Sequence, residues 1–442
     1  MSRKVRRLIF YLLAAVFAIS GTTAAFYSNG WRLDTSNFTF HKTGAIFIRV
    51  QPREAEISID GKKAERSNGF LLSGTLIKNL LPGDYEVTIN ADGFKSWNNA
   101  LPVKEGVVTE IKDTVLAPEE VPNVHLASTT AEMALAPLGL AITNNAGKLT
   151  YQDRTLSGSK FIGATADPNR VVTYNGRQDT YLWNDLRERL TVNLNIRFRA
   201  AKPTVNGAAD GSGIRKIIPD PNRTSVVIVT TNKAVYRYNV DSDEVEIISA
   251  APANSVVTSG NEFILDRWED VIAYNFDSRE TRSIMTLESK IKKMEAGGEA
   301  IIALGENGAL MYYTPAKEAR EIAHSVTDFT LGPNNQIAFR EKDGQFNIYY
   351  PTLDLTRHTN ALGEKGEFKW IGTRHLLIIK PEQTLLAELT DPAVNRDEPA
   401  LYAAPIINEP VSQLEVDSAH RIYFITEAGM LNMIDYFDDL IK

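Results

Sequence analysis

The sequence predicts an all-β protein with one N-terminal membrane helix, and three observations lead to this prediction. An uncharged apolar stretch lies near the amino terminus, residues 45–117 alternate apolar and polar side chains in short runs, and a strand-and-turn pattern recurs from there onward. The 442 residues are enough for two or three domains, at roughly 100–200 residues each. We expect a tip and anchor in 1–31, a linker in 32–44, a small antiparallel β-sandwich in 45–117 and a repeat domain in 118–442.

The amino terminus has the composition of a membrane-spanning helix. Arg3, Lys4, Arg6 and Arg7 precede Leu8–Trp31, a stretch of 24 residues that carries no charge. As a helix it would be about 36 Å long, enough to cross a hydrocarbon core of ~30 Å. The side chains predicted to anchor it are Leu8, Ile9, Phe10, Leu12, Leu13, Val16, Phe17 and Ile19, with Trp31 at the outer interface.

The charges around this stretch predict its orientation. Because the basic residues precede it, the amino terminus should be cytoplasmic and the bulk of the chain extracytoplasmic. The alternative is a cleaved signal peptide, since Leu8–Ser20 has the length of its apolar region and Thr23–Ala25 offers small residues for cleavage. Both interpretations export the rest of the chain.

Composition excludes several function classes. Residues beyond the predicted anchor contain 44 Lys and Arg against 55 Asp and Glu, a net charge of −11, so a nucleic-acid partner is not expected. The chain contains no Cys, which excludes disulfides, thiolate metal sites and cysteine nucleophiles. The six His residues are too far apart to form a local HxxxH pair.

Residues 45–117 are typical of a small antiparallel sandwich. Asp60-Gly61, Pro82-Gly83 and Asp92-Gly93 mark turns between alternating runs. The segments Val50–Ala55, Ile57–Lys62, Leu80–Val87 and Ala91–Phe94 resemble a PEGA domain, although this chain has Pro52-Arg53-Glu54-Ala55 in place of Pro-Glu-Gly-Ala. The resemblance implies a binding or spacing module of an exported or envelope protein.

The remainder of the chain repeats. Turn residues followed by a strongly apolar run begin at positions 137, 167, 220, 259, 297, 332, 372 and 417, with a mean spacing of 40 residues. No helical stretch is expected between them. A period of this length, filled with short strands, predicts a β-propeller. Together with the PEGA-like segments and the anchor, this pattern resembles bacterial surface proteins that join PEGA and propeller domains.

The number of copies predicts eight blades, with seven as the alternative because the first copy is the weakest. The last copy lacks an outer strand, and residues 121–128 could supply it and so close the ring. The interval between the turns at 167 and 220 is 53 residues, which indicates an insertion over residues 195–213.

The motifs of familiar enzymes are missing, so we predict no catalytic, cofactor-binding or metal-ligating residue and no cofactor. A calcium site at Asp241, Asp243, Glu244 and Glu246 would lack the glycine of a calcium loop, and a solvated turn is the better interpretation. The two Asp-Pro-Asn-Arg segments at 167 and 220 suit type I turns.

Aromatic residues leave two interpretations open. The third-strand tyrosines Tyr238, Tyr274, Tyr312 and Tyr349 are expected to pack between blades rather than to stack on sugars. Trp97, Trp183, Trp268 and Trp370 fit either role, and a row of exposed ones would favour carbohydrate.

These features predict a non-enzymatic, membrane-anchored envelope protein whose propeller binds a protein or glycan partner. The alternative is an exported glycan-active enzyme with carboxylates at the propeller axis. Arg197, Arg199 and Lys202 in the insertion are the candidate partner-binding residues, because unusual loops on rigid scaffolds often bind ligands. A disordered surface excursion is the competing interpretation of the same loop.

Overall fold

A computed structural model describes residues 3–34, 39–64, 74–359, 366–389 and 401–435. The described residues are almost entirely strands, as the all-β prediction expects, and they contain two helices, of which only the N-terminal one was predicted. The chain divides into two compact units: Met1–Val121 with Leu386–Ile406 and Asp439–Lys442, and Pro122–Leu385 with Ile407–Asp438.

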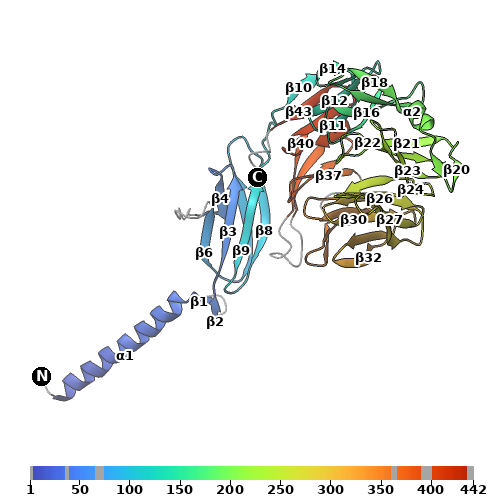
Figure 1. The fold of residues 1–442 in the computed structure, drawn as a ribbon. Coiled ribbons are helices and arrows are strands. Elements are labelled where there is room, and N and C mark those ends of the chain that lie inside the picture. The colour runs from blue at the N-terminus through green and yellow to red at the C-terminus, as the bar shows by residue number, and fades with distance from the viewer. Residues whose placement is uncertain (1–2, 35–38, 65–73, 360–365, 390–400, 436–442) are drawn as a thin grey trace. The chain divides into compact units, whose positions relative to one another are not determined.

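Helix α1 (Arg3–Ser28) contains the predicted anchor (Figure 1). Its segment Ile9–Ser28 is long and apolar enough to cross a bilayer, as judged by length and composition, and large side chains such as Phe17 are exposed (79%). The helix ends before Trp31, contrary to the prediction that the uncharged stretch is helical to that residue. The reason is Gly30, whose φ of +85° stops the helix in the manner of a C-terminal glycine.

The predicted linker 32–44 contains ordered strands. β1 (Trp31–Asp34) pairs antiparallel with β2 (Thr39–Lys42), and both follow directly on α1. Both the backbone N–H and the hydroxyl of Thr43 donate to Gly30 O, at 2.8 and 2.9 Å, and this closes the base of the hairpin.

The sandwich consists of two sheets. One has the order β6 (Thr75–Leu80), β3 (Gly44–Gln51), β9 (Val108–Val115); the other has the order β5 (Lys62–Lys63), β4 (Glu56–Ile59), β7 (Gly83–Asn90), β8 (Trp97–Val103). β3 and β9 run parallel, so the prediction of a wholly antiparallel sandwich was wrong at this pair. Alternation gives the buried face of each strand but not the direction of its neighbour. Ile46, Ile48, Ile57, Val87 and Trp97 share one core between the sheets.

Eight four-stranded sheets follow. Sheet I holds β11 (Thr130–Ala136), β12 (Gly139–Asn144), β13 (Leu149–Tyr151) and β14 (Arg154–Thr155). Sheet II holds β15 (Lys160–Ala164), β16 (Arg170–Asn175), β17 (Thr180–Asp185) and β18 (Leu190–Asn193). Sheet III holds β21 (Ile214–Pro219), β22 (Val226–Thr231), β23 (Val235–Asn239) and β24 (Val245–Ser249). Sheet IV holds β25 (Val256–Ser259), β26 (Glu262–Arg267), β27 (Asp270–Asn275) and β28 (Thr281–Thr286).

The later sheets have the same order. Sheet V holds β29 (Ile291–Gly297), β30 (Ala300–Gly305), β31 (Leu310–Thr314) and β32 (Lys317–Ala323). Sheet VI holds β33 (Val326–Leu331), β34 (Ile337–Glu341), β35 (Phe346–Tyr350) and β36 (Leu355–Thr359). Sheet VII holds β37 (Glu367–Ile371), β38 (His375–Ile379), β39 (Thr384–Leu389) and β40 (Leu401–Ile407). Sheet VIII holds β41 (Val411–Val416), β42 (Ile422–Thr426), β43 (Leu431–Ile434) and, as its outer strand, β10 (Val124–Ala127).

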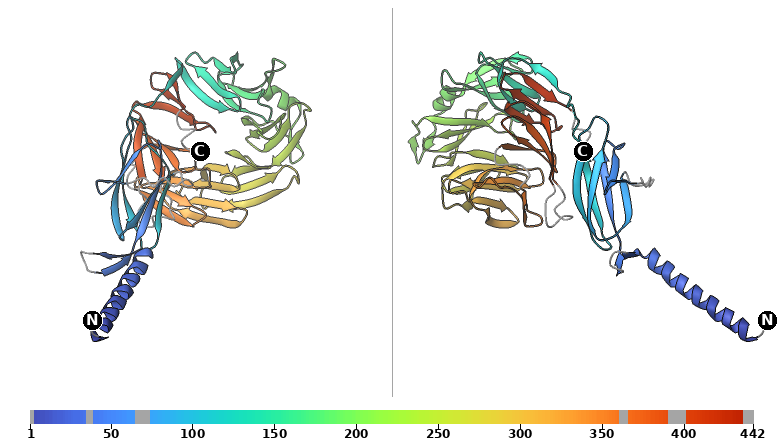
Figure 2. Two further views of the ribbon diagram at one scale, coloured as in Figure 1. Left: turned by 90° about the vertical axis from the view of Figure 1, so that its left-hand side faces the viewer. Right: turned by 180° about the vertical axis from the view of Figure 1, so that it is seen from behind.

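The sheets form a ring, which Figure 2 shows from two sides. First strands of neighbouring sheets lie in contact, among them β41 of sheet VIII and β11 of sheet I. Gln413 fixes that junction, because its side chain both accepts from Met133 N (2.9 Å) and donates to Met133 O (2.7 Å). Radial four-stranded sheets around a common axis are a β-propeller.

Each predicted turn position lies at the junction of a first and a second strand, and those strands pair antiparallel in every sheet. Apolar side chains fill the spaces between sheets. Tyr238 of sheet III, for example, packs with Val172 and Trp183 of sheet II. The predicted packing role of Tyr238, Tyr274, Tyr312 and Tyr349 agrees with their exposure, which is 3% or less.

The insertion between sheets II and III is ordered, and it contains the second helix, which was not expected from the sequence. α2 (Leu194–Ala200) begins at Asn193, whose side chain accepts from Ile196 N (3.1 Å) as an N-cap. Leu194 and Phe198, four residues apart, form its buried face. A short hairpin follows, made of β19 (Thr204–Val205) and β20 (Ala208–Ala209).

Candidate functional site

A cavity of about 500 Å³ lies among the first strands of sheets V to VIII. β29, β33, β37 and β41 each contribute to its wall. The lining residues are Lys293, Glu295, Asp328, Thr330, Leu331, Glu367, Phe368, Lys369, Trp370, Glu415 and Val416. We call this the first-strand cavity; its volume lies in the range of ligand sites, roughly 300–1,000 Å³.

Lys293 is the most constrained charge in the cavity wall. Its ammonium lies 3.1 Å from Glu295 Oε1 and 2.9 Å from Asp328 Oδ1, and it also donates to Phe329 O. Burial disfavours the ammonium form, but the attraction of Glu295 and the hydrogen bond to Asp328 outweigh it and raise the pKa of Lys293. Lys293 therefore stays charged and holds β29 against β33.

A second lysine joins the next two strands. Lys369 Nζ of β37 lies 2.7 Å from Glu415 Oε2 of β41, and both side chains are about 30% exposed. The neighbouring Trp370 is half-buried and donates its indole N–H to Thr330 O (3.3 Å). Gly332 makes room for this ring, because a Cβ at that position would lie 2.6 Å from Trp370 Cε2.

Charge in the cavity is unbalanced. Two lysines face four carboxylates, those of Glu295, Asp328, Glu367 and Glu415, which leaves a formal charge of −2. The lysines are engaged by three of these carboxylates. Glu367 is exposed at the start of β37 and is the carboxylate most open to a ligand. The cavity thus combines net negative charge with one accessible aromatic ring.

A second hollow, of about 370 Å³, lies between sheets I and II. Its polar groups bond mainly to the protein itself: Arg154 donates to Leu186 O, and Asn184 bonds to the hydroxyls of Thr173 (2.9 Å) and Thr191 (3.1 Å). These internal hydrogen bonds indicate that the polar groups around the hollow stabilise the fold.

The three cations predicted for partner binding have different environments in the structure. Arg197 makes a two-pronged ion pair with Asp243, Nε to Oδ1 at 2.8 Å and Nη2 to Oδ2 at 3.2 Å. Arg199 and Lys202 are exposed, and Lys202 has a φ of +53° at the end of the helix. Arg197 therefore links the insertion to sheet III, whereas Arg199 and Lys202 are exposed to solvent.

The Arg197 contact is one copy of a repeated arrangement. Tyr238 OH also donates to Asp243, and the hydrogen bond from Arg197 lowers the pKa of that carboxyl. In the second copy, Arg320 Nη1 of sheet V lies 2.8 Å from Asp354 Oδ2 of sheet VI, and Tyr349 OH of sheet VI donates to the same carboxylate (2.9 Å). In both copies the tyrosine precedes the aspartate by five residues, a spacing that could have revealed the arrangement in the sequence.

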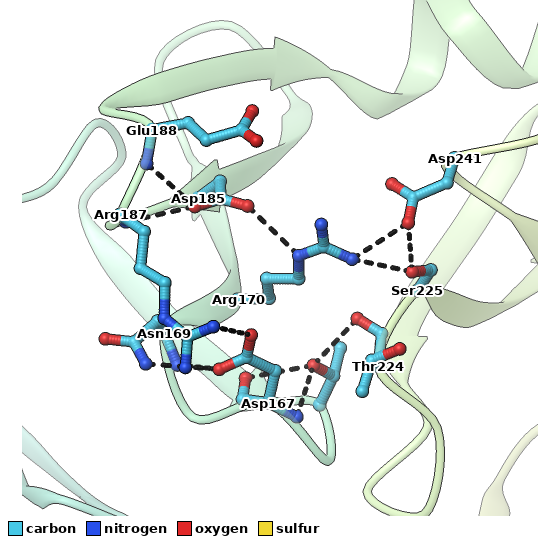
Figure 3. Close-up of polar contacts among 10 residues, drawn as sticks. Asp167, Asn169, Arg170, Asp185, Arg187, Glu188, Thr224, Ser225 and Asp241 are labelled. Atoms are coloured by element: carbon cyan, nitrogen blue, oxygen red, sulfur yellow. Dashed lines mark hydrogen bonds and ion pairs between the residues drawn. The ribbon is translucent and has the colours of Figure 1, made fainter.

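The Asp-Pro-Asn-Arg segments are turns, as predicted, but their arginines also join sheets. In Figure 3, Arg170 points from sheet II toward Asp241 of sheet III, with distances of 3.0 Å to Asp185 Oδ2 and 2.9 Å to Asp241 Oδ2. Burial opposes its charge, yet these two carboxylates raise the pKa of Arg170. Arg223, in the second segment, lies 3.9 Å from Asp277 of sheet IV.

Three acidic residues between Asp241 and Glu246 form ion pairs with three different arginines. Asp241 binds Arg170, Asp243 binds Arg197, and Glu246 binds Arg237 (3.2 Å). Within the described ranges, no group of three or more His, Asp or Glu is arranged to hold a metal ion.

The tryptophans do not form an exposed row in the described part of the chain. Trp97 and Trp183 are buried, at 1% and 3% exposure, and Trp370 lies in the first-strand cavity. Trp268 is 50% exposed at a turn with a φ of +69°, with Lys290 Nζ 4.6 Å from its ring centre.

Comparisons with known proteins leave the family open. No family model and no curated protein matches the chain. Among solved structures, the computationally designed Ika8 protein is similar over 70% of this chain and 97% of its own, with 9% identity and a TM-score of 0.47. BamB from Moraxella catarrhalis is similar over 71% of this chain and 98% of its own, with 12% identity and a TM-score of 0.44. Hsv2p of Kluyveromyces lactis is similar over 64% of this chain and 96% of its own, with 9% identity and a TM-score of 0.40.

Proposed function

We propose that this protein is a non-enzymatic, membrane-anchored binding protein whose propeller lies outside the cytoplasm. The first-strand cavity binds a partner protein through a positively charged segment. The observation that carries the proposal is the pairing of a formal charge of −2 with an accessible aromatic side chain in a cavity of about 500 Å³. A cation is attracted by both features, since carboxylates and the face of an indole each favour positive charge.

The rest of the architecture supports a platform for binding. The eight sheets are the eight blades of a closed ring, with β10 completing the last blade. Closure protects strand edges and makes the first strands a rigid frame for the cavity. The PEGA-like segment 45–117 follows the anchor and precedes the propeller in the chain, and we assign it the role of a spacer.

A glycan partner is less well supported. Sugar-binding surfaces use exposed aromatic side chains, and only Trp268 and Trp370 of the five tryptophans combine accessibility with a place in the described propeller. The net negative charge of the cavity favours a basic peptide over a neutral glycan.

A glycan-active enzyme is the second candidate, and one observation favours it: four carboxylates converge on the first-strand cavity. Three of them hold lysines as counter-ions, however, and this role competes with proton transfer to a sugar. We expect the purified protein to release no reducing ends from cell-wall glycans. Release that is abolished by Glu367→Gln would establish the enzyme instead.

The binding proposal is tested with a tetra-arginine peptide and the full-length protein in detergent. Glu367→Lys changes the charge at this exposed position from −1 to +1 and should weaken binding about tenfold, since a change of two unit charges at about 6 Å from a cation in water is worth roughly 1.4 kcal/mol. The matched control is Glu318→Lys, which changes another exposed carboxylate, on the outer strand β32. Equal affinity for the two variants would show that the peptide binds the acidic surface at large.

The topology is tested with single cysteines, because the natural chain has none. A membrane-impermeant maleimide applied to intact cells should label Leu353→Cys, an exposed propeller position (48%), and should not label Ser2→Cys. The reverse pattern would place the propeller in the cytoplasm.

A further inference from the structure

The hairpin β1–β2 that follows α1 has two chemically different faces. Directly opposed residues of an antiparallel pair project to the same side, and so do residues two apart on one strand. Trp31 pairs with Lys42 and Leu33 with Phe40, so these four side chains share one face. Leu33 is 43% exposed and Phe40 is 63% exposed, which leaves apolar surface open on that face.

The opposite face is polar and is bonded to its surroundings. His41 Nδ1 lies 2.9 Å from Glu105 Oε1, and its Nε2 lies 2.8 Å from Thr39 Oγ1. Arg32, opposite His41, reaches Asn79 Oδ1 at 3.0 Å. These bonds fix the hairpin by its polar face, while Leu33 and Phe40 on the other face stay exposed among the residues that the structure describes.

The uncovered face continues the apolar surface of α1. Phe26 and Trp31 are in edge contact, with ring centroids 6.1 Å apart, across the helix end. On the polar face of the hairpin, Arg32 also contacts the helix end: its guanidinium lies 3.3 Å from the centroid of the Tyr27 ring and donates to Tyr27 O (2.8 Å). Aromatic rings beside cations are typical of the zone between lipid headgroups and acyl chains.

We propose that the Leu33–Phe40 face of this hairpin inserts into the outer interfacial layer of the membrane that α1 crosses, so that its partner is the lipid itself. The inference rests on the proposed anchoring by α1 and extends it from a single helix to a helix with a second, shallow contact. Lys42, on the same face, lies where it can reach anionic headgroups. Such a contact would restrict the tilt of the exported domain on its anchor.

Spin labels test the proposal in the full-length protein, reconstituted into vesicles of phosphatidylcholine with a minor fraction of phosphatidylglycerol. Phe40→Cys is labelled with a nitroxide, whose accessibility to lipid-soluble oxygen and to a water-soluble nickel complex reports its depth. Leu353→Cys is the water-exposed control, and Val16→Cys in α1 is the lipid-exposed control. Residues 16, 40 and 353 are all exposed, so the substitutions spare the core.

We expect the ratio of oxygen to nickel accessibility at position 40 to lie between those at 16 and 353 and to exceed the latter several-fold. A ratio at 40 equal to that at 353, with 16 in lipid, overturns the hairpin contact and leaves the anchor intact. Shielding of position 40 from both reagents means that protein covers the face, which also overturns it. A water-exposed label at position 16 overturns the anchor and the hairpin contact together.

Discussion

The insertion at residues 195–213 and the first-strand cavity differ in how their charges are used. In the insertion, Arg197 is paired with Asp243, and Asp210 accepts hydrogen bonds from Thr231 and Tyr236, both at 2.8 Å. In the cavity, paired lysines leave surplus carboxylate on the wall, with Glu367 exposed. The insertion uses its polar groups for folding, whereas the proposed binding cavity also has an exposed carboxylate, that of Glu367.

An unusual stretch of sequence is therefore not by itself evidence of a binding site. The insertion stands out because it breaks the repeat, yet its ring Phe198 lies between Tyr236 and Tyr238, with centroids 5.4 and 5.6 Å away. This packing also contradicts the interpretation of the loop as a disordered excursion. The cavity residues are inconspicuous in the sequence, since four separate repeats supply them.

Phe198→Ala in the insertion should destabilise the protein more than any other substitution considered below. Phe198 is 2% exposed, so truncation leaves a void and should lower the free energy of unfolding by about 3–5 kcal/mol. Urea unfolding followed by tyrosine and tryptophan fluorescence measures it. Ile196→Ala on the same helix is the control, since Ile196 is 68% exposed and its loss should be nearly neutral. Equal losses for both variants would mean that the insertion is not docked.

A pH effect of intermediate size is expected from Asp210. Burial disfavours its carboxylate, but hydrogen bonds from Ser212, Tyr236 and Thr231 outweigh this and lower the pKa of Asp210 from 3.8 to about 2. A pKa lowered by folding stabilises the folded state above the unfolded value, here by about 2 kcal/mol, and this contribution disappears as the pH falls from about 4 to 2.

Asp210→Asn should therefore lower stability at pH 7 and flatten the acid limb of the stability curve. Urea midpoints measured between pH 7 and pH 2 give both quantities. The exposed Asp153 provides the control Asp153→Asn, which should leave the curve unchanged. If Asp210→Asn keeps the full acid dependence, another carboxylate is responsible for it.

A smaller effect is expected from the cross-sheet arginines. Arg197→Ala and Arg320→Ala each remove a half-exposed pair with an aspartate, and solvent screening limits the loss to about 0.5–1 kcal/mol. Thermal unfolding should give similar shifts for the two, because each Arg meets the same tyrosine–aspartate unit. Arg199→Ala should shift nothing. A large shift for Arg199→Ala alone would contradict the assignment of the stabilising contact to Arg197.

The sequence predicted the fold well where local chemistry sets it. Turn residues such as Asp220-Pro221 mark the junction of first and second strands, and the all-apolar runs that follow give the buried second strands. Residues 121–128 were correctly expected to add a strand, since β10 pairs with β43. Helix α2 was missed because its own signals, an Asn cap and two apolar residues four apart, are weak beside the strand repeat that surrounds it.

The candidate site could not be predicted because several first strands contain register shifts. These shifts interrupt the regular alternation of side chains from which the side of the sheet that each residue faces is predicted. In β29 the register shifts between Ile291 and Lys293, and β33 and β41 contain similar shifts near their starts. A bulge changes which side chains point toward the axis, and one sequence does not show where it falls. The closeness of Lys369 and Glu415, 46 residues apart, is likewise set by ring geometry.

Photo-crosslinking can locate the peptide on the full-length protein. A tetra-arginine peptide with a benzophenone at one end is irradiated with the full-length protein, and the adducts are located by mass spectrometry. If the first-strand cavity binds the peptide, we expect adducts in β29, β33, β37 and β41, with loss of labelling in Glu367→Lys. Adducts concentrated in residues 195–213, and unchanged in that variant, would contradict it and return the binding role to the insertion.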